Sequence, residues 1–341
     1  MRLFVIKVVV FLFVPFLLAS SLDYYVSKKL KSTKNFPGEN EVWNDIYDGN
    51  IIADIAIYGS SRAWVQFDPG LIKKELHISC YNFGEDGSNI VLQYVRHKQF
   101  LKFNLKPKLI ILSVDIWTLR RSVNPYPTTR FYPYMLFKFD VKNTLESNSI
   151  TFNPAYFSIP FLRYLKAPQI LKLLPSRGDS NFVTVLGNYK LPFTETGNVR
   201  INGFRGMEIS FSDDEFSRNQ NQLKNSIVEV DTNLITAIRK FVVEVLEDDI
   251  SLLMIYPPEL KMGQKIVTNR QEIMSQFINI SNDYGIPFYD YSDSTLSYNK
   301  EYFYNVQHLN KTGAEIFTIN LIDNVLKPIG KNLNYIRSVP K

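Results

Sequence analysis

Cysteine and histidine are scarce in this chain of 341 residues. Its one cysteine, Cys80, rules out an intramolecular disulfide and any metal site built from cysteines. Cys80 stands in the apolar run Ile-Ser-Cys-Tyr, so we expect it to pack as a small hydrophobic side chain. We predict neither a cofactor nor a bound metal, because aspartates near strand ends are more typical of helix caps and turns; here these are Asp54, Asp86 and Asp115.

Clustered basic motifs are also missing, although the formal charge is +6 and the isoelectric point is near 9.0. The lysines and arginines are scattered, and no zinc-finger or RNA-recognition signature accompanies them. We therefore predict solvated surface charge and no nucleic-acid partner. A hydrophobic content of 45% allows one large α/β domain with insertions, or two smaller domains.

The longest apolar run lies at the N-terminus, over residues 3–22, and is interrupted only by Lys7 and Pro15. Twenty residues are enough to cross a bilayer core, and Arg2 and Lys7 precede the apolar centre as in a signal peptide or signal anchor. Ala19-Ser20-Ser21 offers a cleavage site, which would make the protein secreted. We favour an uncleaved transmembrane helix over residues 1–22, an extracytoplasmic domain and a polar stalk over 23–50. Several lysines after the helix weaken the positive-inside argument for this orientation.

The chain then alternates short apolar strands with helical patterns, which favours βαβ units and a parallel sheet. We expect the fold domain over residues 51–330, as a three-layer α/β/α sandwich with five mainly parallel strands. The expected strands are residues 55–58, 77–83, 108–114, 251–256 and 287–291.

Residues 117–215 break this rhythm and are rich in proline, asparagine and aromatic residues. We interpret them as a long, partly helical insertion after the third strand. Its aromatic side chains are expected to form a small core of the insertion. The alternative is that they stack on sugar rings, bind acyl chains or contact a partner.

Gly59-Ser60-Ser61 directly follows the first strand, and Asp68-Pro69 opens a helix shortly afterwards. A strand that leads through a tight turn into a helix presents a hydroxyl at the carboxyl edge of the sheet, where open α/β sheets bind ligands. Ser61 is therefore the candidate nucleophile. The alternative for Gly-Ser-Ser alone is that the serines merely end a buried strand.

His308 is the candidate base because it precedes a final helix, where a loop imidazole faces the same sheet edge. Thr312 and Glu315 fit a capping box for that helix. His77 begins a strand and His97 falls within a helical pattern, so neither has comparable surroundings. A second block, from Asn82 to Ser88, has two glycines three residues apart after a strand.

Gly-Ser-Ser after the first strand, Gly87 in the second block and His308 in His-Leu-Asn-x-x-Gly-Ala together resemble the SGNH (GDSL-like) hydrolase superfamily. The resemblance covers about residues 52–116 and 250–327. It implies a flavodoxin-like sandwich with Ser61 as nucleophile and His308 as base. It also implies that the amides of Ser61 and Gly87 stabilise the oxyanion.

The chain departs from the family pattern at two positions. Asn305 stands where the family has the aspartate three residues before the histidine, which implies a weakened triad or a Ser–His dyad. Asp115 stands where the third block supplies an asparagine to the oxyanion, and a carboxylate would repel that anion. Arg62, beside the nucleophile, is expected to bind an anionic substrate or to form a structural salt bridge.

Two functions follow from these observations. The first is an anchored serine esterase or O-acyltransferase that acts on acylated carbohydrate of an exported polysaccharide or other envelope polymer. By similarity to envelope proteins with a membrane anchor and an SGNH-like domain, we expect a membrane-bound acyltransferase as a partner. The second is a catalytically weak binding or scaffolding partner of such an enzyme, suggested by Asn305 and Asp115. An α/β-hydrolase elbow is disfavoured because that fold places several strands before its nucleophile.

Overall fold

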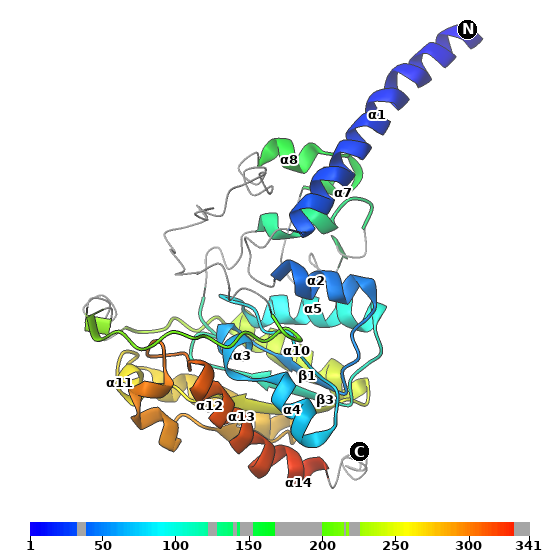
Figure 1. Cartoon of the computed structure of the whole chain (residues 1–341). Helices are drawn as coiled ribbons and strands as arrows, with labels where there is room; N and C mark the ends of the chain where they lie inside the picture. Colours follow the sequence, from blue (N-terminus) through cyan, green and yellow to red (C-terminus); the bar gives the residue numbers. More distant parts are fainter. Residues whose placement is uncertain are drawn as a thin grey trace. The chain divides into compact units, whose positions relative to one another are not determined.

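The computed structural model describes residues 1–32, 39–121, 128–138, 142–143, 153–167, 200–214, 216–217 and 226–330. Its contacts divide the chain into two compact units (Figure 1). The first unit comprises Met1–Asn44 and Tyr126–Asn198. The second comprises Asp45–Pro125 and Val199–Lys341.

The second unit contains a five-stranded sheet in the order β2-β1-β3-β4-β5, and all four strand pairs are parallel. The strands are β1 (Ile55–Tyr58), β2 (Cys80–Asn82), β3 (Leu109–Ser113), β4 (Ser251–Tyr256) and β5 (Phe288–Asp290). The predicted α/β class and parallel sheet are thus confirmed. Strands β2, β3 and β5 are shorter than expected, since the flanking residues leave the ladder.

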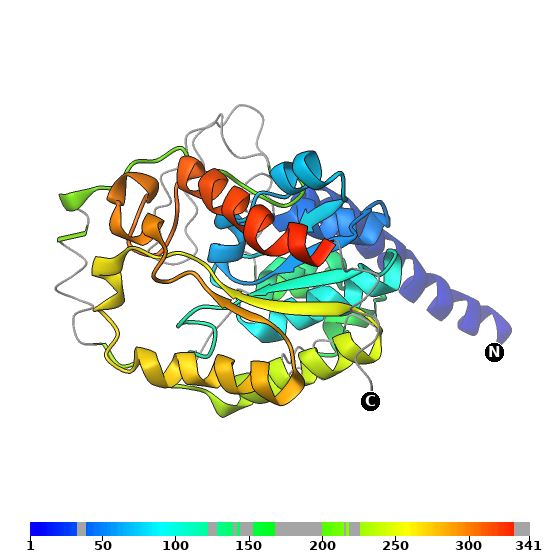
Figure 2. The same ribbon diagram turned by 90° about the horizontal axis from the view of Figure 1, so that it is seen from below.

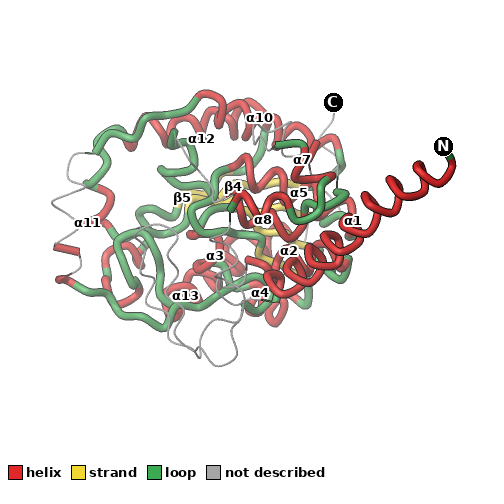
Figure 3. Tube along the Cα trace, turned by 90° about the horizontal axis from the view of Figure 1, so that it is seen from above, coloured by secondary structure: helices red, strands yellow, loops and turns green. Residues whose placement is uncertain are grey.

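The three central strands are apolar on both faces because helices cover both. Every residue of β1 and β3 is buried, as is typical of parallel strands between two helical layers. Figures 2 and 3 show the strands between the two layers. One layer holds α3 (Ser61–Gln66), α4 (Pro69–Leu76) and α13 (Lys311–Leu321); the other holds α5 (Ile90–Phe103), α10 (Thr232–Glu247) and α12 (Arg270–Tyr284).

Polar side chains begin several of these helices. Asp68 accepts hydrogen bonds from the amides of Gly70 and Leu71, and Pro69 takes the first helical position, as predicted for α4. The final helix begins differently from the predicted capping box. Asn310 is its N-cap and accepts from the amide of Gly313, so the helix starts before Thr312.

Cys80 begins β2 and is buried in a hydrophobic core that also contains residues of β1 and α13, as the sequence predicts. The remaining short elements of this unit lie in loops or continue the last helix. They are α11 (Lys261–Gln264), η3 (Thr295–Tyr298), η4 (Lys300–Tyr302), η5 (Ile322–Leu326) and α14 (Lys327–Gly330).

The first unit is built around α1 (Arg2–Lys31), which is 30 residues long. Its other described elements are η1 (Thr128–Tyr134), α7 (Ala155–Ser158), α8 (Leu162–Lys166) and the start of α2 (Glu39–Asp48). Aromatic residues form its small core, where Trp43 packs edge-on against Phe131 with ring centroids 5.5 Å apart. The insertion's described aromatics therefore contribute to a core. Tyr126 and Phe139 lie outside the residues whose side chains are described.

Residues 23–32 and 39–50 are the described part of the segment that was predicted to be a polar stalk. Helix α1 continues for nine residues beyond position 22, and α2 follows. The sequence looked polar there because one side of α1 carries lysines while Val26 and Leu30 are buried. A helix with a single buried stripe has too few apolar residues to stand out by composition.

Candidate active site

The turn after β1 requires glycine at position 59. Gly59 has φ +150°, and a Cβ there would lie 2.7 Å from the carbonyl oxygen of Ser113 and 2.8 Å from the Cβ of Ala63. Both the backbone conformation and the close approach exclude a larger residue. The chain can therefore turn directly from β1 into α3, and Ser61 becomes the first residue of that helix at the carboxyl edge of the sheet.

Ser61 and His308 meet at this edge although they are 247 positions apart in the sequence. The Oγ of Ser61 lies 2.7 Å from the Nε2 of His308. Ser61 comes from the β1–α3 turn, and His308 comes from the loop that precedes α13. This distance is within the range that general-base catalysis requires.

The side chain of Asn305 determines which nitrogen of His308 carries the proton. Its Oδ1 accepts hydrogen bonds from the backbone amides of Gln307 (2.9 Å) and His308 (3.0 Å), so the atom facing the imidazole must be the oxygen. The same Oδ1 lies 2.9 Å from the Nδ1 of His308, which therefore donates. Nε2 is left with its lone pair towards Ser61, the tautomer that a general base needs.

Burial and charge both keep this imidazole neutral. Loss of hydration, with the positive charge of Arg62 as a second cause, lowers the pKa of His308 to about 3. The ring of Tyr304 stacks on the imidazole, with centroids 5.3 Å apart and planes 13° apart. At neutral pH the imidazole is available to accept a proton, but an imidazolium formed there would have no carboxylate partner at Nδ1.

Gly87 lies in the loop after β2, which is tied to the nucleophile turn. The amide of Glu85 donates to the carbonyl of Gly59 (3.1 Å), and the hydroxyl of Ser88 donates to the same carbonyl (3.3 Å). Glu85 also forms a buried ion pair with Arg96 at 2.7 Å. Gly87 has φ +66°, and a Cβ there would meet nothing within 4 Å, so glycine is needed for the conformation and the space above it is open.

Asp115 follows β3 and contacts the serine next to the candidate nucleophile. Its Oδ2 accepts from the hydroxyl of Ser60 at 2.6 Å, and its Oδ1 accepts from the backbone amide of Trp117 at 2.7 Å. Asp115 is buried, with 1% of its surface exposed. The carboxylate therefore holds the Ser60–Ser61 turn against β3, and in this arrangement it acts as an acceptor and not as a donor.

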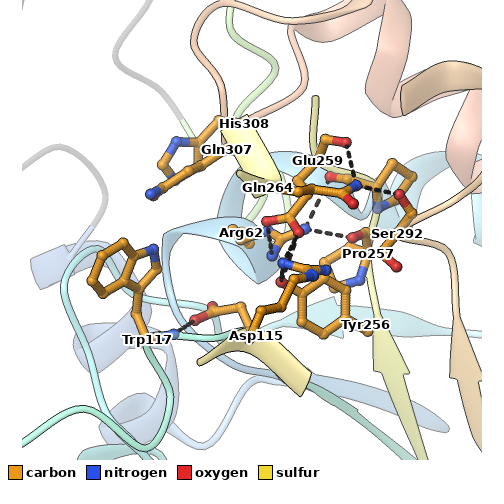
Figure 4. Close-up of polar contacts among 12 residues, drawn as sticks. Arg62, Asp115, Trp117, Tyr256, Pro257, Glu259, Gln264, Ser292, Gln307 and His308 are labelled. Carbon is orange, nitrogen blue, oxygen red and sulfur yellow. Dashed lines mark hydrogen bonds and ion pairs between the residues drawn. The ribbon is translucent and has the colours of Figure 1, made fainter. Parts of the chain in front are cut away.

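Arg62 points away from Ser61 into the protein interior, where it is 1% exposed. Its guanidinium pairs with Glu259 at 3.5 Å and donates to the carbonyls of Pro257 and Pro258 (Figure 4). The guanidinium carbon also lies 4.7 Å from the centre of the Tyr256 ring. Of the two roles expected for Arg62, the structure contains the salt bridge.

A second arginine completes this cluster. Arg270 from α12 forms an ion pair with Glu259 and donates to the hydroxyl of Tyr256 at 3.0 Å. Its guanidinium also lies over the Tyr256 ring, at 4.9 Å from the ring centre. We call Arg62, Tyr256, Glu259 and Arg270 the buried ionic cluster. Two arginines share one glutamate there, so the cluster has a net positive charge behind the site.

The aspartates considered for metal binding do not form a cluster among the described residues. Asp54 precedes β1 and pairs with Lys108 at 2.8 Å, which places it at the opposite end of the strand from Ser61. Asp115 lies near Ser61 but is committed to Ser60 and Trp117.

Sequence reasoning did not identify Ser60, Tyr304 or the buried ionic cluster as parts of this region. Ser60 and Tyr304 both stand within the motifs that drew attention to Ser61 and His308, so their position was a usable signal. The cluster gave no signal, because Arg62 and Glu259 are 197 positions apart. Only the fold brings them together.

A polar cavity of about 440 Å³ lies beside the start of α13. It is lined by Met207, Glu208, Ile209, Ser210, Asn310, Lys311, Thr312 and Glu315. Its α13 side begins two residues after His308. Lys311 and Glu208 form an ion pair across it at 2.8 Å.

No family model matches this sequence, and no curated protein matches it either. Solved structures with a similar chain path include a Streptococcus pneumoniae protein described as a platelet activating factor. It is 10% identical, with a TM-score of 0.42, over 93% of this chain and 98% of that one.

Two Bacteroides structures are also similar. One, from Bacteroides fragilis, is described as an acylhydrolase and is 13% identical, with a TM-score of 0.37, over 82% of this chain and 87% of that one. The other is a GDSL-like lipase from Bacteroides thetaiotaomicron, 10% identical, with a TM-score of 0.39, over 84% and 98%. Similarity at this level assigns no activity and no site residue to this chain.

Proposed function

We propose that this protein is a serine esterase or acyltransferase in which Ser61 is the nucleophile and His308 is the general base. The observation that carries the proposal is the 2.7 Å hydrogen bond between Ser61 Oγ and His308 Nε2, together with the Nδ1 proton fixed by Asn305. A hydroxyl becomes a nucleophile when a correctly oriented base removes its proton. Nε2 lies within hydrogen-bonding distance of Ser61 Oγ, and it carries the lone pair that can accept the proton.

The reaction proceeds in two acyl transfers. Ser61 Oγ attacks the acyl carbon while its proton moves to Nε2 of His308, and the departing alcohol then takes that proton. Water or a sugar hydroxyl next attacks the acyl-serine and loses its proton to Nε2. The proton returns to Ser61 Oγ as the new acid or ester leaves. The imidazole therefore begins and ends each transfer neutral.

The oxyanion is stabilised by backbone amides. Ser61 is the first residue of α3, and an amide at that position has no partner within its helix. The loop that carries Gly87 is tied to Gly59, two residues before the nucleophile. Each correctly placed donor typically contributes about 3–4 kcal/mol to the transition state. Asp115 adds no donor, which makes a modest rate the expectation.

The acyl group is proposed to belong to a carbohydrate of an exported polysaccharide or other envelope polymer. The cavity beside α13 supports a polar acceptor, since Glu208, Ser210, Asn310 and Thr312 offer hydrogen-bonding groups to hydroxyls. Helix α1 is long and apolar enough to anchor the chain in a membrane. We propose that the domain is extracytoplasmic and works beside a membrane-bound acyltransferase, as expected from the order of its segments.

A second candidate function is a binding or scaffolding partner with little chemistry of its own. Asn305 favours it because an amide cannot balance the imidazolium charge, and Asp115 favours it because its carboxylate faces the nucleophile turn. In this case the Ser61–His308 pair would bind an acyl group or polymer without transferring it.

A fluorophosphonate probe separates the two functions, because it reacts only with an activated serine. We expect the full-length protein to be labelled at Ser61 and the Ser61→Ala variant not to be. Ser60→Ala is the matched control, since it removes the neighbouring hydroxyl and leaves the Ser61–His308 pair in place; it should still be labelled, at a reduced rate.

Absence of labelling in a folded protein would overturn the esterase proposal. A complementation assay then tests the scaffold. If Ser61→Ala and His308→Ala restore polymer acylation as fully as the unmodified protein does, the chain acts as a partner and not as an enzyme.

A further inference from the structure

The N-terminal half of α1 is apolar and exposed. With 30 residues the helix is about 45 Å long, and no residue of its most apolar stretch is buried. Residues 3–22 alone extend about 30 Å, the thickness of a bilayer core. Figure 1 shows this half projecting beyond α7 and α8, which lie beside the other half.

The end of the apolar stretch has the features of a membrane interface. Tyr24 and Tyr25 are exposed by 67% and 57%. The ammonium groups of Lys28 and Lys29 lie 6.0 Å and 5.9 Å from the centres of these two rings. Exposed tyrosines followed by lysines are enriched where a spanning helix leaves the hydrocarbon and enters the headgroups. We therefore place the boundary between hydrocarbon and headgroups, called the interface level below, at the helical turn after Leu22.

The inserted segment is fixed to α1 at this same level. The guanidinium of Arg163 makes two hydrogen bonds of 2.6 Å to the carboxylate of Asp23, and both side chains are buried. The amide of Phe161 donates to Asp23 at 2.6 Å, and Ser27 and Tyr164 share a hydrogen bond of 2.7 Å. A buried, bidentate pair fixes geometry strongly, so α8 has a defined height on α1.

One aromatic residue of the insertion reaches further along α1. The ring of Phe137 lies 6.4 Å from that of Phe16, which is six residues, or about 9 Å, before Leu22. Phe137 is nonetheless 52% exposed and has φ +57°, a conformation that bulky residues rarely adopt. Its backbone is held there by a hydrogen bond from its amide to the carbonyl of Phe157 at 2.8 Å.

We propose that this part of the insertion is seated in the membrane interface, with Phe137, Ile159 and Leu165 in contact with lipid. All three are exposed apolar side chains. The segments that carry them contact α1 either at Asp23, at the interface level, or at Phe16, within the apolar stretch. Exposed Lys138 and Lys166 adjoin two of them and suit anionic headgroups. The first unit then lies in the membrane surface in addition to being attached by a single helix.

A lipid surface is favoured over a protein partner because Phe137 adjoins the apolar stretch of α1. Phe137 packs against a residue within the apolar stretch, so a side chain at that depth faces the same medium as Phe16. If α1 spans a bilayer, that medium is the boundary of headgroups and acyl chains. The inference does not depend on the proposed enzymatic function.

Depth-dependent fluorescence quenching tests the proposal on the full-length chain. Phe137→Cys and Leu165→Cys are each labelled with an uncharged, environment-sensitive fluorophore and reconstituted into vesicles of phosphatidylcholine and phosphatidylglycerol. The lipids carry a nitroxide either near the headgroup or in the middle of the acyl chain. Native Cys80 is buried, and the unsubstituted chain measures any background labelling.

Controls on α1 calibrate the depth scale. Phe11→Cys lies within the apolar stretch and should be quenched by the deep nitroxide. Ser32→Cys is exposed on the same chain but lies sixteen positions after Phe16, or about 24 Å along the helix, and should be quenched by neither. Phe137→Cys and Leu165→Cys should lose on the order of half their emission to the shallow nitroxide, as expected at about 5–10 Å below the headgroups.

If both labels are quenched no more than the label at Ser32→Cys, the proposal is overturned, whether water or a second protein surrounds them. A contact between copies of the chain would appear as label-to-label energy transfer without quenching, and would overturn it too. Two independent positions keep the test valid if one substitution disturbs folding, which circular dichroism of each variant reports.

Discussion

Ser61 and Arg62 are adjacent in the sequence but serve two very different regions. Ser61 faces the sheet edge and contacts His308, which is neutral at pH 7 and whose Nδ1 donates to the uncharged side chain of Asn305. Arg62 enters the interior and joins the buried ionic cluster with Glu259 and Arg270. A single residue step along α3 therefore separates a neutral reacting site from a charged support.

The difference teaches how this site manages charge. A conventional triad places a carboxylate beside the imidazole, which stabilises the imidazolium that forms during catalysis. Here the carboxylates lie elsewhere: Asp115 on Ser60 and Glu259 between two arginines. After burial, the positive charge of Arg62 is the second cause that lowers the pKa of His308. Proton transfer to His308 is therefore correctly oriented but electrostatically unfavourable.

We expect the largest effect on reactivity from removing the base at the reacting site. His308→Gln should lower the rate of fluorophosphonate labelling by about 10²- to 10⁴-fold, since general-base catalysis contributes that much. The free energy of unfolding in urea should change little, because His308 is half-buried and its partners are short loop contacts. A labelling rate within a few-fold of the unmodified protein would contradict the assigned role.

A substitution in the buried ionic cluster should instead lower the free energy of unfolding. Glu259→Gln leaves the buried Arg62 and the partly buried Arg270 without their shared carboxylate, so the free energy of unfolding should fall by about 3–5 kcal/mol. Urea denaturation followed by circular dichroism measures it. The matched control is Glu229→Gln, which breaks the exposed Arg121–Glu229 pair and should cost about 1 kcal/mol or less. Equal losses in the two variants would show that the cluster is not supporting the fold.

Asn305→Asp should move the reacting site towards a triad. A carboxylate at Nδ1 stabilises the imidazolium, so we expect labelling at pH 8 to accelerate by about tenfold, a modest share of the range for acid–base catalysis. The substitution should also raise the pKa of His308, because a nearby negative charge favours the protonated form. A slower variant at pH 8 would indicate that Asn305 does more than orient the ring.

The pH profile separates charge from orientation in that variant. With the pKa of His308 at about 3, the unmodified protein should label at a constant rate between about pH 5 and 8. In Asn305→Asp the rate should fall as the pH drops through the raised pKa, since a protonated imidazole cannot accept a proton. A falling limb in the unmodified protein over this range would contradict the low pKa.

The last prediction concerns stability at moderately low pH. Burial lowers the pKa of both His97 and His308 to about 3, whereas an unfolded histidine titrates near 6.5. As the pH falls below about 6.5 the unfolded chain binds protons that the folded chain does not. The free energy of unfolding should therefore fall by roughly 1.4 kcal/mol per pH unit for each histidine. Urea midpoints at pH 7 and pH 5, with His97→Gln for comparison, measure this slope.

Much of the fold could be predicted from residues alone. The strand over 251–256 and the helix that Asp68 caps are found at the expected places. Buried parallel strands are continuous apolar runs, so their signal is local and strong. The extension of α1 to Lys31 was not predicted, because a half-buried helix carries a weak signal. The region over 168–199, within the expected insertion, lies outside the described residues.

The site divides in a similar way. Ser61, His308 and Asn305 could be named because each stands in a recognisable motif at the end of an expected element. Their catalytic roles stay predictions, whereas their hydrogen bonds are given by the structure. The direction of Arg62 and the Ser60–Asp115 contact were not predictable. A side chain next to a turn can face either side of it, and only packing decides which.

The sequence by itself determined the order of strands and helices, the apolar N-terminal helix and the residue types available for acyl chemistry. These depend on local patterns of polarity and on the conformations that glycine, proline and capping residues allow. The tertiary structure alone decided that His308 receives Arg62 as a cationic neighbour, and that Asp23 holds the insertion against α1. Electrostatic interactions act through space over a few ångströms, so they depend on which distant segments the fold brings together.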